Sequence, residues 1–145
     1  MTIFSESLED VLLAKNLKIN DLIVGTQISR ENLRNYLTGR FEPSLPHAVS
    51  IAQFCGCSLD YLLGLIDEPR YGEYSVADMQ FYEHYLQVIK TRSISHYRVA
   101  KDLNLSLNVY RNWRDGAIPS LKVFTALAKY LGVTADSLVG RERIK

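Results

Sequence analysis

Two short stretches of the sequence place hydrogen-bonding side chains around an apolar pair that is spaced for one face of a helix. Leu33 and Tyr36 form the inward pair of the first stretch, and Tyr110 and Trp113 form that of the second. The polar side chains left outside are Arg30, Glu31, Arg34, Asn35, Asn108, Arg111 and Asn112. Arginine can donate two hydrogen bonds to guanine, asparagine can bond adenine at two atoms, and glutamate can accept from cytosine. This chemistry predicts that these side chains read DNA bases.

A second set of residues is suited to phosphate groups. Hydroxyl and cationic side chains lie at expected helix starts and beside the two stretches, where they can position a protein on a nucleic-acid backbone. This set consists of Lys18, Ser29, Arg40, Ser95, His96, Ser106 and Arg114. The alternative for any such residue is that it belongs to an ordinary solvated face.

The chain repeats itself. At an offset of 77 residues Phe4 matches Phe81 and Arg34 matches Arg111, and after one deletion the offset becomes 76, where Asp60 matches Asp136. A single deletion in a loop explains both registers. We therefore predict two domains, residues 1–66 and 76–145, joined by a linker at 67–75.

The elements that position these residues are predicted to be helices. Apolar residues recur at three- and four-residue spacing, as in Phe124, Leu127, Ala128 and Leu131, whereas no alternating run indicates a strand. This favours an all-α fold with five short helices in each copy. The residues expected to cap helix N-termini are Ser29, Ser44, Ser58, Ser75, Ser95, Ser106, Ser120 and Thr134.

The segment from Leu22 to Gly39, with the Pro43-Ser44 that follows, resembles the Cro/lambda-repressor-type (XRE-like) helix-turn-helix family. The segment from Val99 to Gly116, with Pro119-Ser120, resembles it too. The resemblance implies two tandem lambda-repressor-like DNA-binding domains that insert recognition helices into the major groove of double-stranded DNA. It also implies a transcriptional regulator, acting as a repressor, of a bacterium, phage or mobile element. The turn position often taken by glycine in the family is here Gln27 and Asn104.

Charge and surface composition keep a second function class open. Residues 1–68 hold five Lys and Arg against nine Asp and Glu, and residues 69–145 hold twelve against seven, so the halves carry −4 and +5. Leu107 and Val109 stand where the first copy has Arg30 and Asn32, which removes polar groups from the second surface. The alternative is a protein-interaction module on the same scaffold, such as an antirepressor, an antitoxin-like partner or an inhibitor protein.

The second copy has a stripe of apolar residues in addition to the core positions that both copies share. Met79, Tyr82 and Leu86 recur at helical spacing, and the first copy has polar residues at the corresponding places. We expect this stripe to dock the two copies as an intramolecular pseudo-dimer or to form a homodimer interface.

Other function classes find no support in the sequence. It contains no nucleophile and base pair, metal-ligand cluster or phosphate-binding glycine loop, so we expect no enzyme, metal or cofactor. Cys55 and Cys57 match Leu131 and Val133 in the other copy, which indicates buried structural thiols. The absence of a signal sequence or apolar span predicts a cytoplasmic protein.

Overall fold

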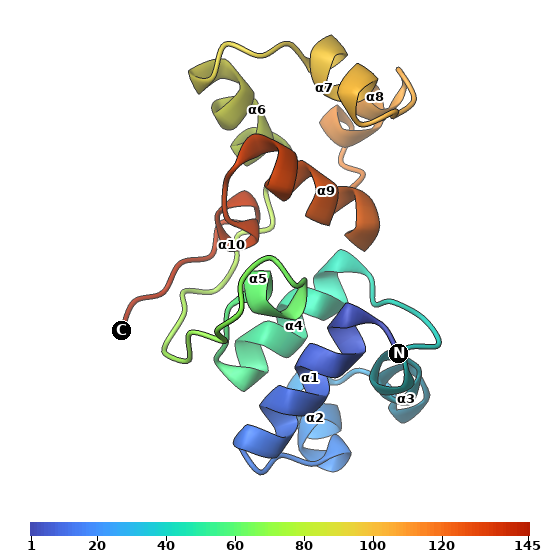
Figure 1. The fold of residues 1–145 in the computed structure, drawn as a ribbon, viewed down its shortest axis with the longest axis vertical. Helices are drawn as coiled ribbons and strands as arrows, with labels where there is room; N and C mark the ends of the chain where they lie inside the picture. Colours follow the sequence, from blue (N-terminus) through green and yellow to red (C-terminus); the bar gives the residue numbers. More distant parts are fainter.

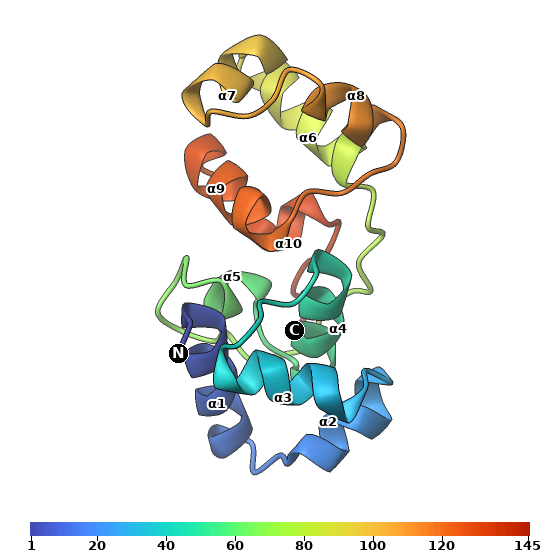
Figure 2. The same cartoon turned by 90° about the vertical axis from the view of Figure 1, so that its right-hand side faces the viewer.

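The chain folds into helices alone. The computed structural model describes residues 1–145 and contains ten helices, with one isolated antiparallel bridge between Tyr74 and Arg143 and no strand. Figures 1 and 2 show two groups of five helices stacked along the long axis of the molecule. The predicted all-α fold is confirmed. None of the ten helices combines the length and the apolar character that crossing a bilayer requires.

Both groups follow the same order of helices. The first unit comprises α1 (Ile3–Ala14), α2 (Ile19–Thr26), α3 (Arg30–Thr38), α4 (Leu45–Cys55) and α5 (Leu59–Leu62). The second unit comprises α6 (Phe81–Thr91), α7 (His96–Asp102), α8 (Val109–Arg114), α9 (Leu121–Leu131) and α10 (Ala135–Leu138). The main difference lies in the third helix, which has nine residues in the first unit and six in the second.

Six of the eight predicted N-caps are confirmed. A side-chain oxygen accepts a hydrogen bond from a first-turn backbone N–H at Ser29, Ser44, Ser58, Ser95, Ser120 and Thr134. Such a bond satisfies a donor that the helix itself leaves unpaired.

The predicted caps at Ser75 and Ser106 are wrong. The helix after Ser75 begins only at Phe81, and the Ser75 hydroxyl instead accepts from the backbone N–H of Glu142. The helix after Ser106 begins at Val109, and the Ser106 hydroxyl accepts from the backbone N–H of Asn108 in the turn before it. In both places additional non-helical residues lie between the serine and the first residue of the helix.

The first unit packs around an aliphatic core that includes Leu8, Leu22, Leu33 and both cysteines. Cys55 and Cys57 are fully buried free thiols, and burial raises their pKa values to about 11 and about 12. A thiol with so high a pKa stays protonated at neutral pH and is a poor nucleophile and metal ligand. The cysteines fill core space, as their alignment with Leu131 and Val133 predicts.

The second unit packs around an aromatic core. The ring of Trp113 meets those of Phe81 and Tyr85 edge-on, with centroids 5.2 Å apart in each case. The His96 imidazole joins this cluster: its centroid is 4.3 Å from that of Tyr110, and its Nδ1 is 2.7 Å from the Tyr85 hydroxyl. Burial lowers the pKa of His96, because a charged imidazolium loses its hydration there.

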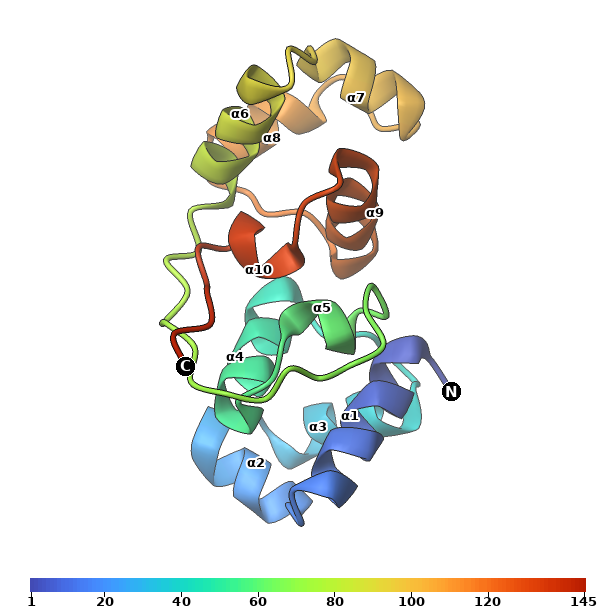
Figure 3. The ribbon, with the colours of Figure 1, turned by 60° about the vertical axis from the view of Figure 1, so that its left-hand side comes forward.

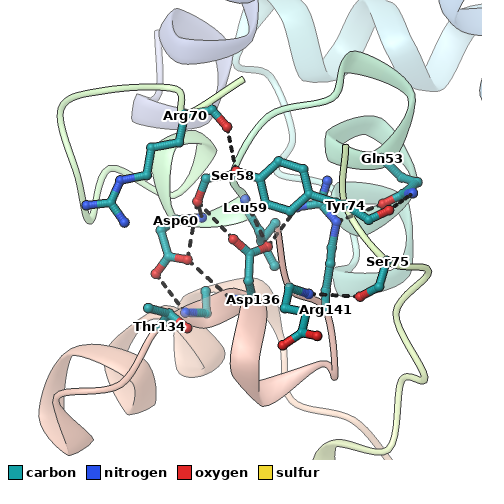
Figure 4. Close-up of polar contacts among 12 residues, drawn as sticks. Gln53, Ser58, Leu59, Asp60, Arg70, Tyr74, Ser75, Thr134, Asp136 and Arg141 are labelled. Atoms are coloured by element: carbon teal, nitrogen blue, oxygen red, sulfur yellow. Dashed lines mark hydrogen bonds and ion pairs between the residues drawn. The ribbon is translucent and has the colours of Figure 1, made fainter. Parts of the chain in front are cut away.

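The two units meet through their last helices, α5 and α10, which lie face to face in Figure 3. The Asp60 carboxylate of α5 accepts hydrogen bonds from the backbone N–H groups of Ala135 (2.7 Å) and Asp136 (3.2 Å) at the start of α10. The Asp136 carboxylate accepts in return from the backbone N–H of Leu59 (3.1 Å) and the hydroxyl of Ser58 (2.9 Å). Each helix start is therefore capped by the equivalent aspartate of the other unit (Figure 4).

Arg141 closes this joint from the C-terminal side. Its side chain is completely buried, forms a 2.8 Å ion pair with Asp136, and donates from Nε to the Gln53 side-chain oxygen at 2.8 Å. Its guanidinium also lies 4.0 Å from the centroid of the Tyr74 ring. Leu65 is the equivalent residue of the first unit, so the buried cation occurs on one side of the joint only.

The segment between the units is held to both of them along its length. It runs from the end of α5 to the start of α6 and is longer than the predicted linker at 67–75. Pro69 accepts a backbone hydrogen bond from Ser58, and Gly72 donates one to Gly56. Glu73 accepts from Ile144 in the C-terminal tail. The connection is therefore a fixed strap, and the two units have little freedom to move apart.

Removing the buried cation tests the joint. We expect Arg141→Ala to lower the free energy of unfolding by about 3–5 kcal/mol, because it leaves the Asp136 carboxylate buried beside Asp60 without its cation, with only the bonds from Leu59 and Ser58 remaining. Urea unfolding followed by circular dichroism measures this. Arg92→Ala, which removes an exposed arginine that forms no ion pair, should change the value by no more than about 0.5 kcal/mol. A loss below about 1 kcal/mol for Arg141→Ala would contradict the described joint.

The buried imidazole predicts a pH dependence of stability. Because the pKa of His96 is lower in the fold than the value of about 6.5 of an unfolded chain, the folded state favours neutral imidazole. The contribution of neutral His96 to the free energy of unfolding is complete above about pH 6.5 and is lost as the pH falls through the lowered pKa. The urea midpoint, followed by fluorescence of the single tryptophan Trp113, should fall from pH 7.5 to 5 more steeply than in His96→Gln. Equal slopes would contradict the inward placement of His96.

Candidate nucleic-acid interface

The first polar stretch lies on α3. Leu33 and Tyr36 are buried as predicted, and the Tyr36 hydroxyl is 2.7 Å from His47 Nδ1 on α4, which anchors the inner face of the helix. Burial also raises the pKa of Tyr36. Of the predicted base-reading residues, Arg30, Glu31 and Arg34 are exposed and Asn35 is half-buried. The helix thus presents three fully accessible polar side chains on its outer face.

A sharp turn sets α3 apart from α2. Gln27 ends α2 in the left-handed conformation, with φ 61°, and Asn104 has φ 55° at the same place before α8. Left-handed backbone is unfavourable for most side chains, and asparagine tolerates it better than glutamine. Both turns therefore have the geometry that the family pattern implies, although neither contains glycine.

The predicted phosphate-binding residues of the first unit surround α3. Lys18, Ser29 and Arg40 are all exposed. The Ser29 oxygen accepts from the backbone N–H of Asn32 at 3.1 Å, which leaves its hydroxyl hydrogen free to donate. Arg30, Arg34 and Arg40 form no ion pair, and Arg30 Nη2 donates to the Asn20 side-chain oxygen. These three arginines therefore lie outside ion-pair distance of any carboxylate.

The second polar stretch is only partly helical. Trp113 is buried and Tyr110 half-buried, as predicted, and Arg111, Asn112 and Arg114 are exposed on α8. Asn108 lies at the N-cap instead of on the helix, and its side chain forms no capping bond. The helical surface is therefore shorter than that of α3, although it holds two arginines in six residues.

The predicted phosphate contacts of the second unit require one correction. Ser95 and Ser106 are exposed and keep a hydroxyl hydrogen free, and Arg114 lies 3.5 Å from Asp115. His96 is different, because its Nδ1 meets Tyr85 and its Nε2 is buried without a partner among aromatic rings. An imidazole turned inward cannot reach a phosphate, so the predicted role of the His96 side chain is wrong.

Several exposed residues on the same part of the second unit were missed by the sequence analysis. Tyr97 and Arg98 on α7 are exposed, as is Lys101 one turn later. The repeat register could have singled out Tyr97, because it aligns this tyrosine with the polar Asn20 of the first unit. The buried joint of Asp60, Asp136 and Arg141 was also missed, although the register paired the two aspartates.

The two polar helices lie on one side of the molecule. In Figure 1 both α3 and α8 are on the right, and both face the viewer in Figure 2, which is turned by 90°. In Figure 3 both recede behind other helices. A single surface therefore presents both helices, because the joint between α5 and α10 fixes how the units are stacked.

The predicted docking stripe does not lie on one helix. Met79 precedes the start of α6 and has φ 59°. The Tyr82 hydroxyl donates to that of Tyr110 at 2.9 Å, and Leu86 packs against the core, so two of the three residues contact their own unit. The units dock instead through α5 and α10. A homodimer contact through Met79, Tyr82 and Leu86 stays a prediction.

Comparison with known proteins agrees with this geometry for the first unit. No curated protein and no solved structure matched the chain. Residues 8–62 match the family model described as Helix-turn-helix, a region that contains α2, the turn at Gln27 and α3. The first unit is therefore similar to helix-turn-helix domains over residues 8–62.

Proposed function

We propose that the protein is a sequence-specific DNA-binding transcriptional regulator that represses by occupying an operator. The observation that carries this proposal is α3 itself: a helix anchored by Leu33 and Tyr36 holds out Arg30 and Arg34, which no carboxylate neutralises. The match of residues 8–62 to the helix-turn-helix family supports the same function. A bacterium, phage or mobile element is the proposed source of such a regulator.

The proposed mechanism places α3 in the major groove. Arg30 and Arg34 donate to guanine, Glu31 accepts from cytosine, and Asn35 bonds adenine with the part of its side chain that remains accessible. Lys18, Ser29 and Arg40 bind flanking phosphates and fix the register. Arg111 and Asn112 read bases in the second unit with Asn108 beside them, while Ser95, Ser106 and Arg114 contact phosphates.

We further propose that the chain acts as an intramolecular pseudo-dimer. Helix-turn-helix dimers read two half-sites that lie one helical turn of DNA apart on one side of the duplex. The reciprocal caps at Asp60 and Asp136 and the strap between the units support this arrangement, since they stack two equivalent units with α3 and α8 on one side. Residues 81–138 then serve as a second helix-turn-helix domain.

The protein-interaction module remains the second candidate, because Leu107 is 71% exposed at the start of the second stretch. An apolar side chain in that position suits a protein surface as well as a base. Retention on duplex DNA distinguishes the two functions, since backbone binding weakens steeply with salt and an apolar protein contact does not.

Arginine substitutions test which unit reads bases. We expect Arg30→Ala and Arg34→Ala each to weaken binding to a duplex selected from a random pool by about 1–3 kcal/mol, because each removes a pair of hydrogen bonds to a base. Arg111→Ala should do the same at a different base pair. Arg92→Ala is the matched control, because Arg92 is an exposed arginine that follows α6, forms no ion pair and lies outside both polar stretches. Negligible effects of all three variants would remove DNA binding as the function.

The number of chains on one duplex tests the pseudo-dimer. We expect one chain to protect two half-sites, because the two units are joined in a fixed orientation. Analytical ultracentrifugation of the complex with labelled DNA measures this ratio. Two chains per duplex would contradict the pseudo-dimer. Loss of that state in Tyr82→Glu with Leu86→Glu, with thermal unfolding of the variant unchanged, would assign the contact to the predicted stripe.

A further inference from the structure

The outer tip of the second unit differs in chemistry from that of the first. In the first unit Arg30 donates to Asn20, so two polar side chains meet where α2 approaches the start of α3. The equivalent residues of the second unit are Leu107 and Tyr97. These two side chains are 71% and 63% exposed, and neither belongs to the core. By the repeat register, a leucine and a tyrosine, called here the apolar tip, take the places of this polar pair.

The turn before α8 holds this tip in place. The Ser106 hydroxyl accepts from the backbone N–H of Asn108, and the Ser106 carbonyl accepts from that of Val109 at 3.1 Å. These bonds close the turn around Leu107 and leave its side chain in solvent. A single exposed leucine needs no explanation by itself, as Leu13 on α1 shows, but Leu107 stands at the start of the stretch that the proposed function places against DNA.

The surroundings of the tip favour a polyanion. Arg98, Lys101, Arg111 and Arg114 are all exposed on α7 and α8. Two of these cations are paired with nearby acids, Arg98 with Asp102 at 3.0 Å and Arg114 with Asp115 at 3.5 Å, whereas Lys101 and Arg111 form no ion pair. Residues 69–145 carry a net charge of +5. Lys101 and Arg111 can bind the phosphates of a duplex, which also offers apolar groups to the tip, whereas a purely apolar protein surface would leave these two cations without partners.

From this arrangement we infer that Leu107 and Tyr97 contact thymine methyl groups, so that the operator consists of two unlike half-sites. The C5-methyl of thymine is the apolar group that base pairs present in the major groove. The half-site of the first unit is read by hydrogen bonds from Arg30 and Arg34, and that of the second unit combines Arg111 with methyl contacts. The inference rests on the proposed function and adds the base chemistry of the second half-site.

Replacing thymine by uracil tests the inference, because uracil lacks only the methyl group. In a duplex selected by the wild-type protein, each thymine is replaced by uracil in turn. We expect a three- to fivefold loss of affinity, roughly the factor for one buried methyl group, at one or two positions confined to one half-site. For Leu107→Ala the replacement should have no effect at the thymine that Leu107 contacts, since that methyl group has lost its partner, whereas a position contacted by Tyr97 should keep its response.

The matched control is Leu13→Ala, because Leu13 on α1 is 74% exposed and lies outside both motifs. This variant should keep the wild-type response to uracil, and thermal unfolding should show that both variants remain folded. Strong duplex binding without any response to uracil would overturn the inference and leave the tip to a protein partner. The inference would also be overturned if Leu107→Ala lost as much affinity for the uracil-substituted duplex as for the thymine duplex. The absence of binding to any duplex would instead overturn the proposed function.

Discussion

The exchange of two aspartates between helix starts is the interaction on which the architecture depends. Asp60 and Asp136 are buried, and burial raises the pKa of Asp60, so each carboxylate needs the backbone donors that the other unit supplies. Helix N-termini favour negative charge, which makes α5 and α10 suitable partners. Because the donors of each unit satisfy the acceptor of the other, neither helix start is complete until the units meet. Arg141 adds a cation to one side and makes the pair unequal.

Both units mount their third helix on a packed inner face, but they use different chemistry to do so. The first unit buries Leu33 and Tyr36 and links the helix to α4 through His47. The second buries Trp113 in an aromatic cluster that also takes in His96. Larger rings occupy more space under α8, and in the repeat register this helix is two residues shorter at its start and one residue shorter at its end than α3. The polar face and the apolar tip of the second unit thus accompany a different core.

Local patterns predicted much of the fold. Three- and four-residue spacing identified the helices, and the inward pairs and the cysteines lie where the repeat register placed them, because burial follows periodicity. Long-range contacts were beyond such patterns. No local signal shows that an aspartate repeated in both units caps a helix 76 residues away, or that His96 turns inward toward Tyr85 instead of outward from a helix start. The Ser75 cap failed for a similar reason, since its partner Glu142 lies in the C-terminal tail.

The stacking of both units within one polypeptide has a consequence for dose response. Two separate subunits must first associate, and their joint occupancy of a site then rises with the square of concentration when the subunits are dilute. Because the strap joins the two units covalently, each unit experiences the other at a high effective concentration. A chain of this kind would occupy its target in proportion to its own abundance, without the threshold that assembly imposes. Each unit can also change its contacts independently, since a substitution in one is not copied into the other.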